Sequence, residues 1–261
     1  MRYLHAGSGP PIFLIHGLLG CSFSWRHLIP ELATRAKVFA VDLLGTGYSD
    51  RVQRLDCSLS ASARRMWQFI DAKCDGPIDL LGTSHGGAVA LRVATLATER
   101  IKRLILVAPV NPWAPRGTKL APFLSNVLVA PLFTRIAPFL RNHYFRRLFA
   151  DKSRIAPGTF EGYAAPLERP GSYDYALSIL RTWNHDLAEL KSALPRISHI
   201  PTLLVWGDHD SAVSPVSAAP LKQNFQHCQL VIVKDVGHLP YEEVPEEFNR
   251  IITDFLFCDS D

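Results

Sequence analysis

The chain has 261 residues, of which 48% are hydrophobic and 20% charged, as in an ordinary globular protein with one large core. Its net charge of +4 is not gathered in a long Lys/Arg run, so we expect no nucleic-acid partner. No segment is apolar enough for a signal peptide or a transmembrane helix, and the five cysteines form no CxxC pair. We therefore expect free thiols, no metal site and a cytoplasmic location.

Short apolar runs alternate with segments of helical spacing along most of the chain. After a possible edge strand at residues 2–5, strand-length runs occupy 12–15, 37–41, 77–81, 103–108, 202–206 and 229–233. Helical patterns fill 23–35, 60–73, 88–99 and 245–257. Continuous apolar strands that alternate with helices predict an α/β fold, with a mostly parallel central sheet and helices on both of its faces.

The segment from 112 to 199 breaks this rhythm, because it is rich in aromatic residues, helical in period and without an apparent sheet strand. We therefore predict a core made of residues 1–111 and 200–261, with residues 112–199 inserted as a helical cap. Residues 112–196 hold 12 Lys/Arg and 6 Asp/Glu, which hints weakly at an anionic substrate and is equally typical of a solvated face.

A Gly-x-Ser-x-Gly motif follows the apolar run at 77–81. Ser84 stands two residues from each of Gly82 and Gly86, at the predicted junction between a strand and a helix. A serine in such a sharp turn presents its hydroxyl outside the sheet, and the free N–H groups of the new helix can stabilise an anion. The motif thus predicts a nucleophile, although a serine in a structural turn would give the same pattern.

Two further polar residues follow strand-length runs. Asp210 comes after the run at 202–206, and His238 comes after the run at 229–233. In a parallel sheet these positions share one edge with Ser84. A histidine can take the serine proton near neutral pH, and a carboxylate on its other ring nitrogen fixes the tautomer. Asp208 competes with Asp210 for the carboxylate role.

An oxyanion formed at Ser84 needs two N–H donors. We assign them to the backbone of His85 and to that of Leu18, in the loop after residues 12–15. The His16 side chain either buttresses this loop or contacts substrate, and His85 either lines the pocket or covers the turn. In the predicted cap, Trp113 and Arg181 are further candidates for substrate binding.

The chain resembles the α/β-hydrolase fold superfamily, in the group with a helical cap. The resemblance rests on residues 16–17, 42–49, 82–87, 206–210 and 237–238. It implies an eight-stranded, mostly parallel sheet and a Ser84–His238–Asp210 triad. Family members usually carry an additional antiparallel hairpin before the stretch that matches residues 1–10. Either the first strand is missing from this sheet, or the stated start lies late in the protein.

A serine nucleophile suits acyl chemistry, so we expect a carboxylic ester hydrolase that needs no cofactor and acts on a small, mostly apolar ester. One alternative is a carbon–carbon bond hydrolase of ring-cleavage products, in which Arg181 would meet a substrate carboxylate. Such enzymes usually carry a tryptophan where this chain has Leu239. Another alternative is a ligand receptor of slow or absent turnover. The sequence carries no signal of the oligomeric state.

Overall fold

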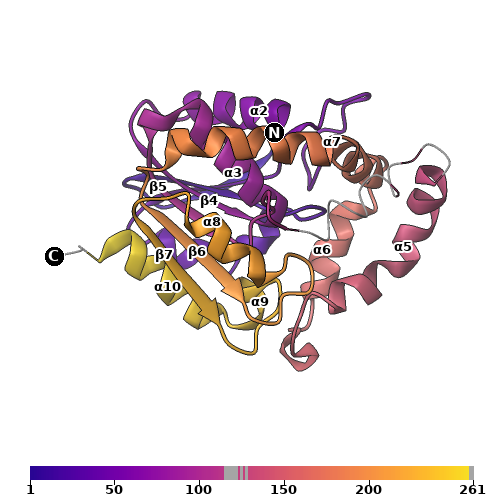
Figure 1. Ribbon diagram of the computed structural model, residues 1–261. Helices are drawn as coiled ribbons and strands as arrows, with labels where there is room; N and C mark the ends of the chain where they lie inside the picture. The colour runs from indigo at the N-terminus through magenta and orange to yellow at the C-terminus, as the bar shows by residue number, and fades with distance from the viewer. Residues whose placement is uncertain (115–122, 124–125, 127–128, 259–261) are drawn as a thin grey trace.

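A seven-stranded sheet forms the centre of the computed structural model, which describes residues 1–114, 123, 126 and 129–258 (Figure 1). Its strands are β1 (Tyr3–Ala6), β2 (Pro11–Ile15), β3 (Lys37–Val41), β4 (Ile78–Thr83), β5 (Ile101–Val107), β6 (Thr202–Gly207) and β7 (Cys228–Val233). They lie in the order β1-β3-β2-β4-β5-β6-β7, and each neighbouring pair is parallel except β1 with β3. The predicted mostly parallel α/β sheet is confirmed.

The sheet has one strand fewer than the eight that the family resemblance implies. β1 pairs antiparallel with β3, from Tyr3 opposite Val41 to Ala6 opposite Val38, and it is the edge strand. Within the described part of the chain no strand pairs with its outer side. The structure thus describes seven strands where the resemblance implies eight.

Helices cover both faces of the sheet (Figure 1). The described α-helices are α1 (Ile29–Leu32), α2 (Leu59–Asp71), α3 (Ser84–Leu96), α5 (Ala130–Arg146), α6 (Thr159–Leu167), α7 (Ser172–Ala193), α8 (Ala218–Lys222), α9 (Pro240–Glu243) and α10 (Pro245–Phe257). One hydrophobic cluster joins α2, α3, α7 and α8 to the sheet, and a second joins α1 and α10 to the opposite face.

The alternation of side chains along each strand produces these two clusters. In β2, Phe13 and Ile15 belong to the cluster under α2 and α3, whereas Ile12 and Leu14 belong to the cluster under α10. All four side chains are fully buried. A strand with both faces buried must be apolar throughout, which explains the unbroken apolar runs in the sequence.

The predicted helix over 23–35 is wrong. The chain forms a short 3-10 turn, η1 (Ser22–Trp25), then a bend, and then the four residues of α1. Pro30 has no N–H to donate to the carbonyl four residues earlier, so a continuous helix cannot pass through it. In addition, the backbone N–H of Ser22 donates to the buried carboxylate of Asp42 at 2.6 Å, which fixes the chain in its turn.

The region between β5 and β6 is helical, as expected, and its described residues contain no strand. α5 and α6 lie at the right of Figure 1, away from the sheet. α7 reaches back over the sheet, because Ile179, Leu187 and Leu190 share the hydrophobic cluster of α2 and α3. The division into a core and a cap at 112 and 199 stays a prediction. None of the described helices combines the length and the apolar character that crossing a bilayer requires.

Candidate active site

Ser84 lies where β4 turns into α3. Its φ of 52° is in the left-handed region, which a residue with a side chain adopts only when its surroundings hold it there. The N–H of Val110 donates to the Ser84 carbonyl at 2.9 Å and so ties the turn to the end of β5. The side chain is half-buried. The turn therefore fixes the backbone of Ser84 and leaves its hydroxyl accessible.

The glycines of the motif are required by close backbone packing. A Cβ on Gly86 would lie 2.2 Å from the carbonyl oxygen of His16, and a Cβ on Gly82 would lie 2.3 Å from the carbonyl oxygen of Gly86. Both distances are shorter than any tolerable contact. Gly86 therefore allows the turn to pack against the end of β2, and Gly82 allows the turn to pack against its own backbone.

Asp210 and His238 form a buried hydrogen-bonded pair. His238 Nδ1 lies 2.7 Å from Asp210 Oδ2, and the exposed fractions of the two side chains are 6% and 0%. The other carboxylate oxygen accepts the N–H groups of Ala212 and Val213, both at 2.8 Å. The carboxylate therefore has a fixed orientation, in which it accepts the Nδ1 proton and leaves Nε2 as the acceptor of the ring.

Asp208, the competing carboxylate, has a different partner. It pairs with His209 at 2.7 Å, and both side chains are exposed to solvent. The hydrogen bond and charge of Asp208 raise the pKa of His209. The two aspartates of this loop thus face different histidines, and only Asp210 contacts His238.

Ser84 and His238 follow parallel strands of one sheet, β4 and β7, so both stand at its carboxyl edge. Tyr241, three residues after His238, is buried beneath this edge. Burial raises the pKa of its hydroxyl, and the neighbouring hydroxyl of Thr83, directly before Ser84, opposes that rise. Among the described residues, Ser84 Oγ makes no hydrogen bond with His238, and catalytic hydrogen bonds are often long in an unliganded site.

The predicted oxyanion donors lie on two sides of the serine. His85 is in the first turn of α3, where backbone N–H groups have no partner within the helix. On the other side, a Cβ on Gly17 would lie 3.7 Å from Ser84 Oγ, so the loop after β2 passes directly beside the nucleophile. Leu18 follows Gly17 in this loop.

His16 holds this loop from inside the protein. Its Nε2 accepts the N–H of Leu43 at 3.1 Å, so its Nδ1 carries the proton and donates to the Gly17 carbonyl at 2.8 Å. Burial lowers the pKa of His16, which keeps the ring neutral. With an exposed fraction of 1%, the His16 side chain is buried beneath the loop that it holds.

The His85 ring packs against α7. Its centroid lies 6.5 Å from that of Trp183, and the two planes are inclined by only 22°. Burial lowers the pKa of His85 to about 4, and the nearby His16 contributes to this shift. The indole N–H of Trp183 is buried, and no hydrogen-bond partner for it is found among the described residues. Trp183 is therefore a residue beside the nucleophile turn that our sequence analysis did not single out.

The two remaining candidates lie away from this arrangement. Trp113 is half-buried and has the ammonium group of Lys191 above its ring at 5.7 Å. Arg181 is exposed on α7, two residues before the buried Trp183 and hence on the other side of the helix. Neither side chain is brought to Ser84 or His238 by a described contact.

Two buried carboxylates after His238 escaped the sequence analysis. Glu243 accepts the N–H groups of Gly237 at 2.6 Å, Ala150 at 3.0 Å and Asp151 at 3.2 Å. The N–H of His238 donates to the Leu148 carbonyl at 2.7 Å. Glu243 therefore joins the histidine loop to the segment that follows α5.

Glu242 binds a different part of the molecule. Its two oxygens accept the guanidinium of Arg26, each at 2.6 Å, and one of them also accepts the Tyr163 hydroxyl at 2.7 Å. The short helix α9 thus connects η1 and α6 to the loop that carries His238. No sequence signal distinguishes this Glu-Glu pair from a solvated one, because its partners are remote in the chain.

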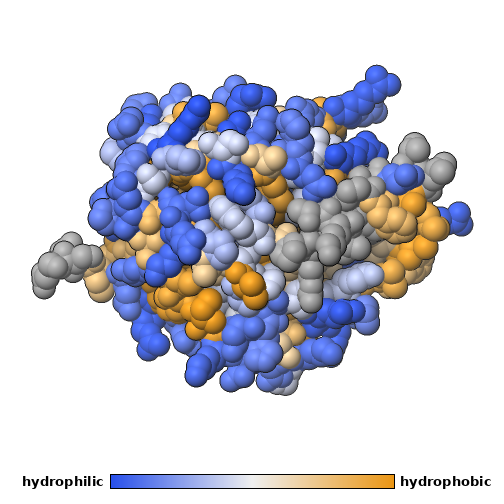
Figure 2. Space-filling model, viewed as in Figure 1, coloured by the Kyte–Doolittle hydropathy of each residue, from blue (hydrophilic) through white to orange (hydrophobic). Residues whose placement is uncertain are grey.

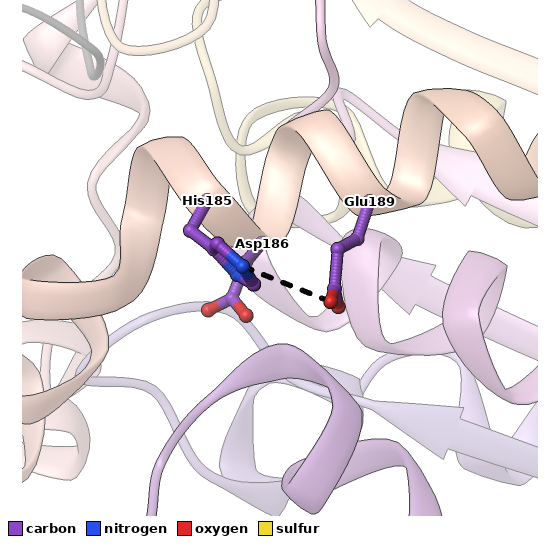
Figure 3. Close-up of side chains that lie close together, drawn as sticks. All are labelled: His185, Asp186 and Glu189. Carbon is purple, nitrogen blue, oxygen red and sulfur yellow. Dashed lines mark ion pairs between the residues drawn. The ribbon is translucent and has the colours of Figure 1, made fainter.

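One cluster on α7 resembles a metal site in composition but has other partners. His185, Asp186 and Glu189 lie close together (Figure 3). Asp186 accepts the hydroxyl of Thr182 at 2.6 Å, and Glu189 has the guanidinium of Arg92 at 3.9 Å. These contacts account for both carboxylates within the protein, and the nearby arginine charge opposes a bound cation. We assign the buried Asp186 to the packing of α7 and the exposed Glu189 to its contact with Arg92.

The chain belongs to the α/β hydrolase fold family, whose sequence model matches residues 10–245. It is similar to a pimeloyl-[acyl-carrier protein] methyl ester esterase of Nitrosomonas europaea, at 29% identity over 93% of this chain and 94% of that protein. It is also similar to a 2-hydroxymuconate semialdehyde hydrolase of a Pseudomonas species, at 28% identity over 96% of this chain and 88% of that protein.

Solved structures of the same fold resemble it closely. An esterase of Thermogutta terrifontis superposes with a TM-score of 0.83 over 98% of this chain and 92% of that one, at 24% identity. The relatives of the chain thus include a methyl ester esterase and a semialdehyde hydrolase, together with lipases such as Lipase 3 of a Moraxella species, which is 27% identical over 92% of this chain and 75% of that protein.

Proposed function

We propose that the protein is a serine-dependent carboxylic ester hydrolase with Ser84, His238 and Asp210 as its triad. The observation that carries the proposal is the buried pair of His238 and Asp210, 2.7 Å apart, at the sheet edge where Ser84 stands in a strained turn. Esterases and lipases among the relatives support the same reaction class.

In the first half of the reaction, Ser84 Oγ attacks the ester carbonyl while His238 Nε2 takes its proton. The tetrahedral oxyanion accepts the N–H groups of His85 and Leu18. When the carbonyl re-forms, the bond to the alcohol breaks, and His238 returns the proton to the departing alkoxide. The products of this half are the free alcohol and an acyl-enzyme on Ser84.

In the second half, His238 takes a proton from water, and the resulting hydroxide attacks the acyl carbonyl. The bond to Ser84 Oγ breaks, and His238 gives its proton to the serine. Asp210 keeps its charge throughout and stabilises the imidazolium in both halves. The carboxylic acid leaves and the enzyme is restored.

The test is an assay of the purified protein with p-nitrophenyl esters from acetate to dodecanoate, beside Ser84→Ala. We expect turnover that the substitution abolishes, and the preferred acyl length measures the pocket. A fluorophosphonate should add to Ser84 in the wild type, as read by mass spectrometry. Ester turnover that survives in Ser84→Ala would refute the proposal.

A second candidate is hydrolysis of a carbon–carbon bond in a ring-cleavage product. Its support is the similarity to the 2-hydroxymuconate semialdehyde hydrolase. The exposure of Arg181 weakens it, because no other residue was assigned to the substrate carboxylate. If every ester fails and a ring-cleavage product is consumed, this candidate replaces the esterase. If neither reacts, a receptor role remains, in which Ser84→Ala would leave ligand binding unchanged.

A further inference from the structure

The exposed side of α5 carries an apolar stripe. Leu132, Ile136, Phe139, Leu140 and Tyr144 recur at spacings of three and four residues, so they share one face of the helix. Their exposed fractions lie between 39% and 85%. Figure 2 shows the hydrophobic colour gathered over α5. A surface helix normally turns such a stripe toward the core. The stripe of α5 faces solvent instead, so its apolar side chains do not contribute to the packing of the core.

The opposite side of α5 is the one that anchors it. Ala130 and Ala137 are buried, and the ring of Phe145 packs against Phe149 and Tyr163 with centroids 5.3 Å and 5.2 Å away. The helix also contacts α6 and α7. Its orientation is therefore set by packing, and the apolar stripe is presented outward by a helix that the protein holds in place.

The charge beside the stripe is of one sign. α5 contains no Asp or Glu, and between residues 112 and 150 the chain has six Lys/Arg and no acidic residue. Arg135, Arg146 and Arg147 are exposed, and no ion pair of theirs is found within the described part of the chain. Arg141, on the inner side, pairs with Glu168 at 3.0 Å. Apolar side chains flanked by arginine are the pattern of a helix that lies in a lipid interface.

A groove continues the surface past the helix. It has a volume of about 540 Å³ between α5 and the α6–α7 corner, and its walls combine apolar residues such as Phe139 and Leu167 with the charged residues Arg141, Glu168, Arg169 and Asp174. Phe139 belongs to both the stripe and the groove. The groove therefore adds a surface of mixed polarity beside the apolar stripe.

We propose that this face of α5 docks the protein onto a lipid surface that contains anionic headgroups. The five apolar side chains would enter the acyl boundary, while the arginines meet the headgroup phosphates. A second copy of the chain fits less well, because a two-fold contact between α5 helices would bring arginines of one sign together. An acidic protein would pair with the arginines but would leave the protruding Phe139, 85% exposed, without an apolar partner.

The docking face is close to the candidate active site along the chain. α5 ends at Arg146, and the carbonyl of Leu148 accepts the N–H of His238. A lipid-bound α5 would thus hold the site near the membrane surface. The inference goes beyond ester hydrolysis and does not depend on it, since it concerns binding alone.

The test is flotation of Ser84→Ala protein with vesicles of phosphatidylcholine and phosphatidylglycerol, against vesicles of phosphatidylcholine alone. We expect binding to the anionic vesicles that weakens with salt, and an about tenfold loss in the double variant Phe139→Ser/Leu140→Ser. Arg135→Gln/Arg146→Gln should weaken binding to the anionic vesicles several-fold. Val216→Ser and Lys102→Gln, which change exposed residues elsewhere, are the matched controls and should bind as the parent does.

Three results would overturn the proposal. The first is no binding to either kind of vesicle, in which case an acidic protein becomes the better partner for the face. The second is binding that neither double variant weakens. The third is a dimer in sedimentation experiments that Phe139→Ser/Leu140→Ser dissociates, since the stripe would then be covered by a second copy.

Discussion

The position of one carboxylate decides how His238 is oriented. Asp210 and Asp208 are two residues apart and chemically identical, yet Asp210 is fully buried against His238 Nδ1 while Asp208 pairs with His209 in solvent. The difference comes from the loop. Its backbone N–H groups at Ala212 and Val213 donate to the second carboxylate oxygen of Asp210 and so hold that side chain inward.

This geometry predicts very different effects for two equal substitutions. Asp210→Asn should lower kcat for ester hydrolysis by roughly 10³- to 10⁴-fold, because an amide in this position favours the wrong tautomer of His238. Asp208→Asn should change kcat by less than about threefold, since its partner is an exposed histidine. Kinetics of both variants, with circular dichroism as the folding control, test the assignment. It would be wrong if Asp208→Asn were the more damaging change.

Burial of His85 predicts a dependence of stability on pH. Its native pKa is about 4, against an ordinary value of 6.5, so between these pH values the unfolded chain binds a proton that the native protein does not. Stability should therefore fall as pH drops from 6.5 to 4, by about 3 kcal/mol from this one residue.

The measurement is urea unfolding across that pH range for the wild type and His85→Gln. The variant should show a shallower loss of stability toward pH 4, whatever its stability at neutral pH. His199→Gln, which replaces an exposed histidine, should keep the slope of the wild type. Equal slopes in all three proteins would mean that His85 does not titrate as its burial implies.

Among the elements, the short helix α9 determines where the histidine loop sits. Glu243 receives backbone N–H groups from both sides of the contact, at Gly237 in the loop and at Ala150 and Asp151 after α5. Since Arg154 is 3.9 Å away, the carboxylate keeps a positive charge nearby as well as its hydrogen bonds. The role of α9 is to fix one loop against another.

Glu243→Gln should therefore affect both stability and rate. The amide has the same shape but replaces one charged acceptor by a donor, so the free energy of unfolding should fall by about 1 to 3 kcal/mol. We expect kcat to fall roughly tenfold to hundredfold through displacement of His238. Thermal unfolding and ester kinetics measure the two effects. Glu247→Gln, in an exposed position of α10, is the control that should change neither.

Local patterns in the sequence were sufficient to predict most strands and helices, and they failed for one helix. The strands β2 to β6 were predictable because both of their faces are buried, which forces an unbroken apolar run. The helix expected over 23–35 failed because helical spacing does not register the break at Pro30 or the anchoring of Ser22 by Asp42. Period alone cannot report a hydrogen bond between residues 20 positions apart.

The same distinction applies to the site. Ser84, Asp210 and His238 each follow a strand, so their shared edge could be inferred from the order of the elements. Glu242 and Glu243 could not, because the partners that justify their burial lie up to 216 residues away. Trp183 was equally hidden, since only the packing of α7 on α3 places it beside His85.

At the scale of the whole molecule, one buried ion pair lies at the end of the sheet opposite to the candidate site. At the amino end, Arg103 of β5 forms two hydrogen bonds of 2.8 Å with the buried carboxylate of Asp79 of β4, directly opposite it in the register. The same guanidinium donates to the carbonyl of Leu256 in α10. Arg103 thus ties two central strands to the last helix, far from the edge that carries Ser84.

This separation predicts a loss of stability without a loss of chemistry. Arg103→Met leaves the Asp79 carboxylate buried and unpaired, which should cost about 3 to 5 kcal/mol of unfolding free energy. The double variant Asp79→Leu/Arg103→Met removes both charges and should recover most of that loss, since an apolar pair of similar volume can replace a buried ion pair. Urea unfolding of the single and double variants gives the coupling. Wherever the variants remain folded, kcat for the best ester should match the wild type, because the carboxyl edge of the sheet is unchanged. If the losses of stability in the single variants Arg103→Met and Asp79→Leu summed to that of the double variant, the pair would not be coupled, and Arg103 would act through α10 alone.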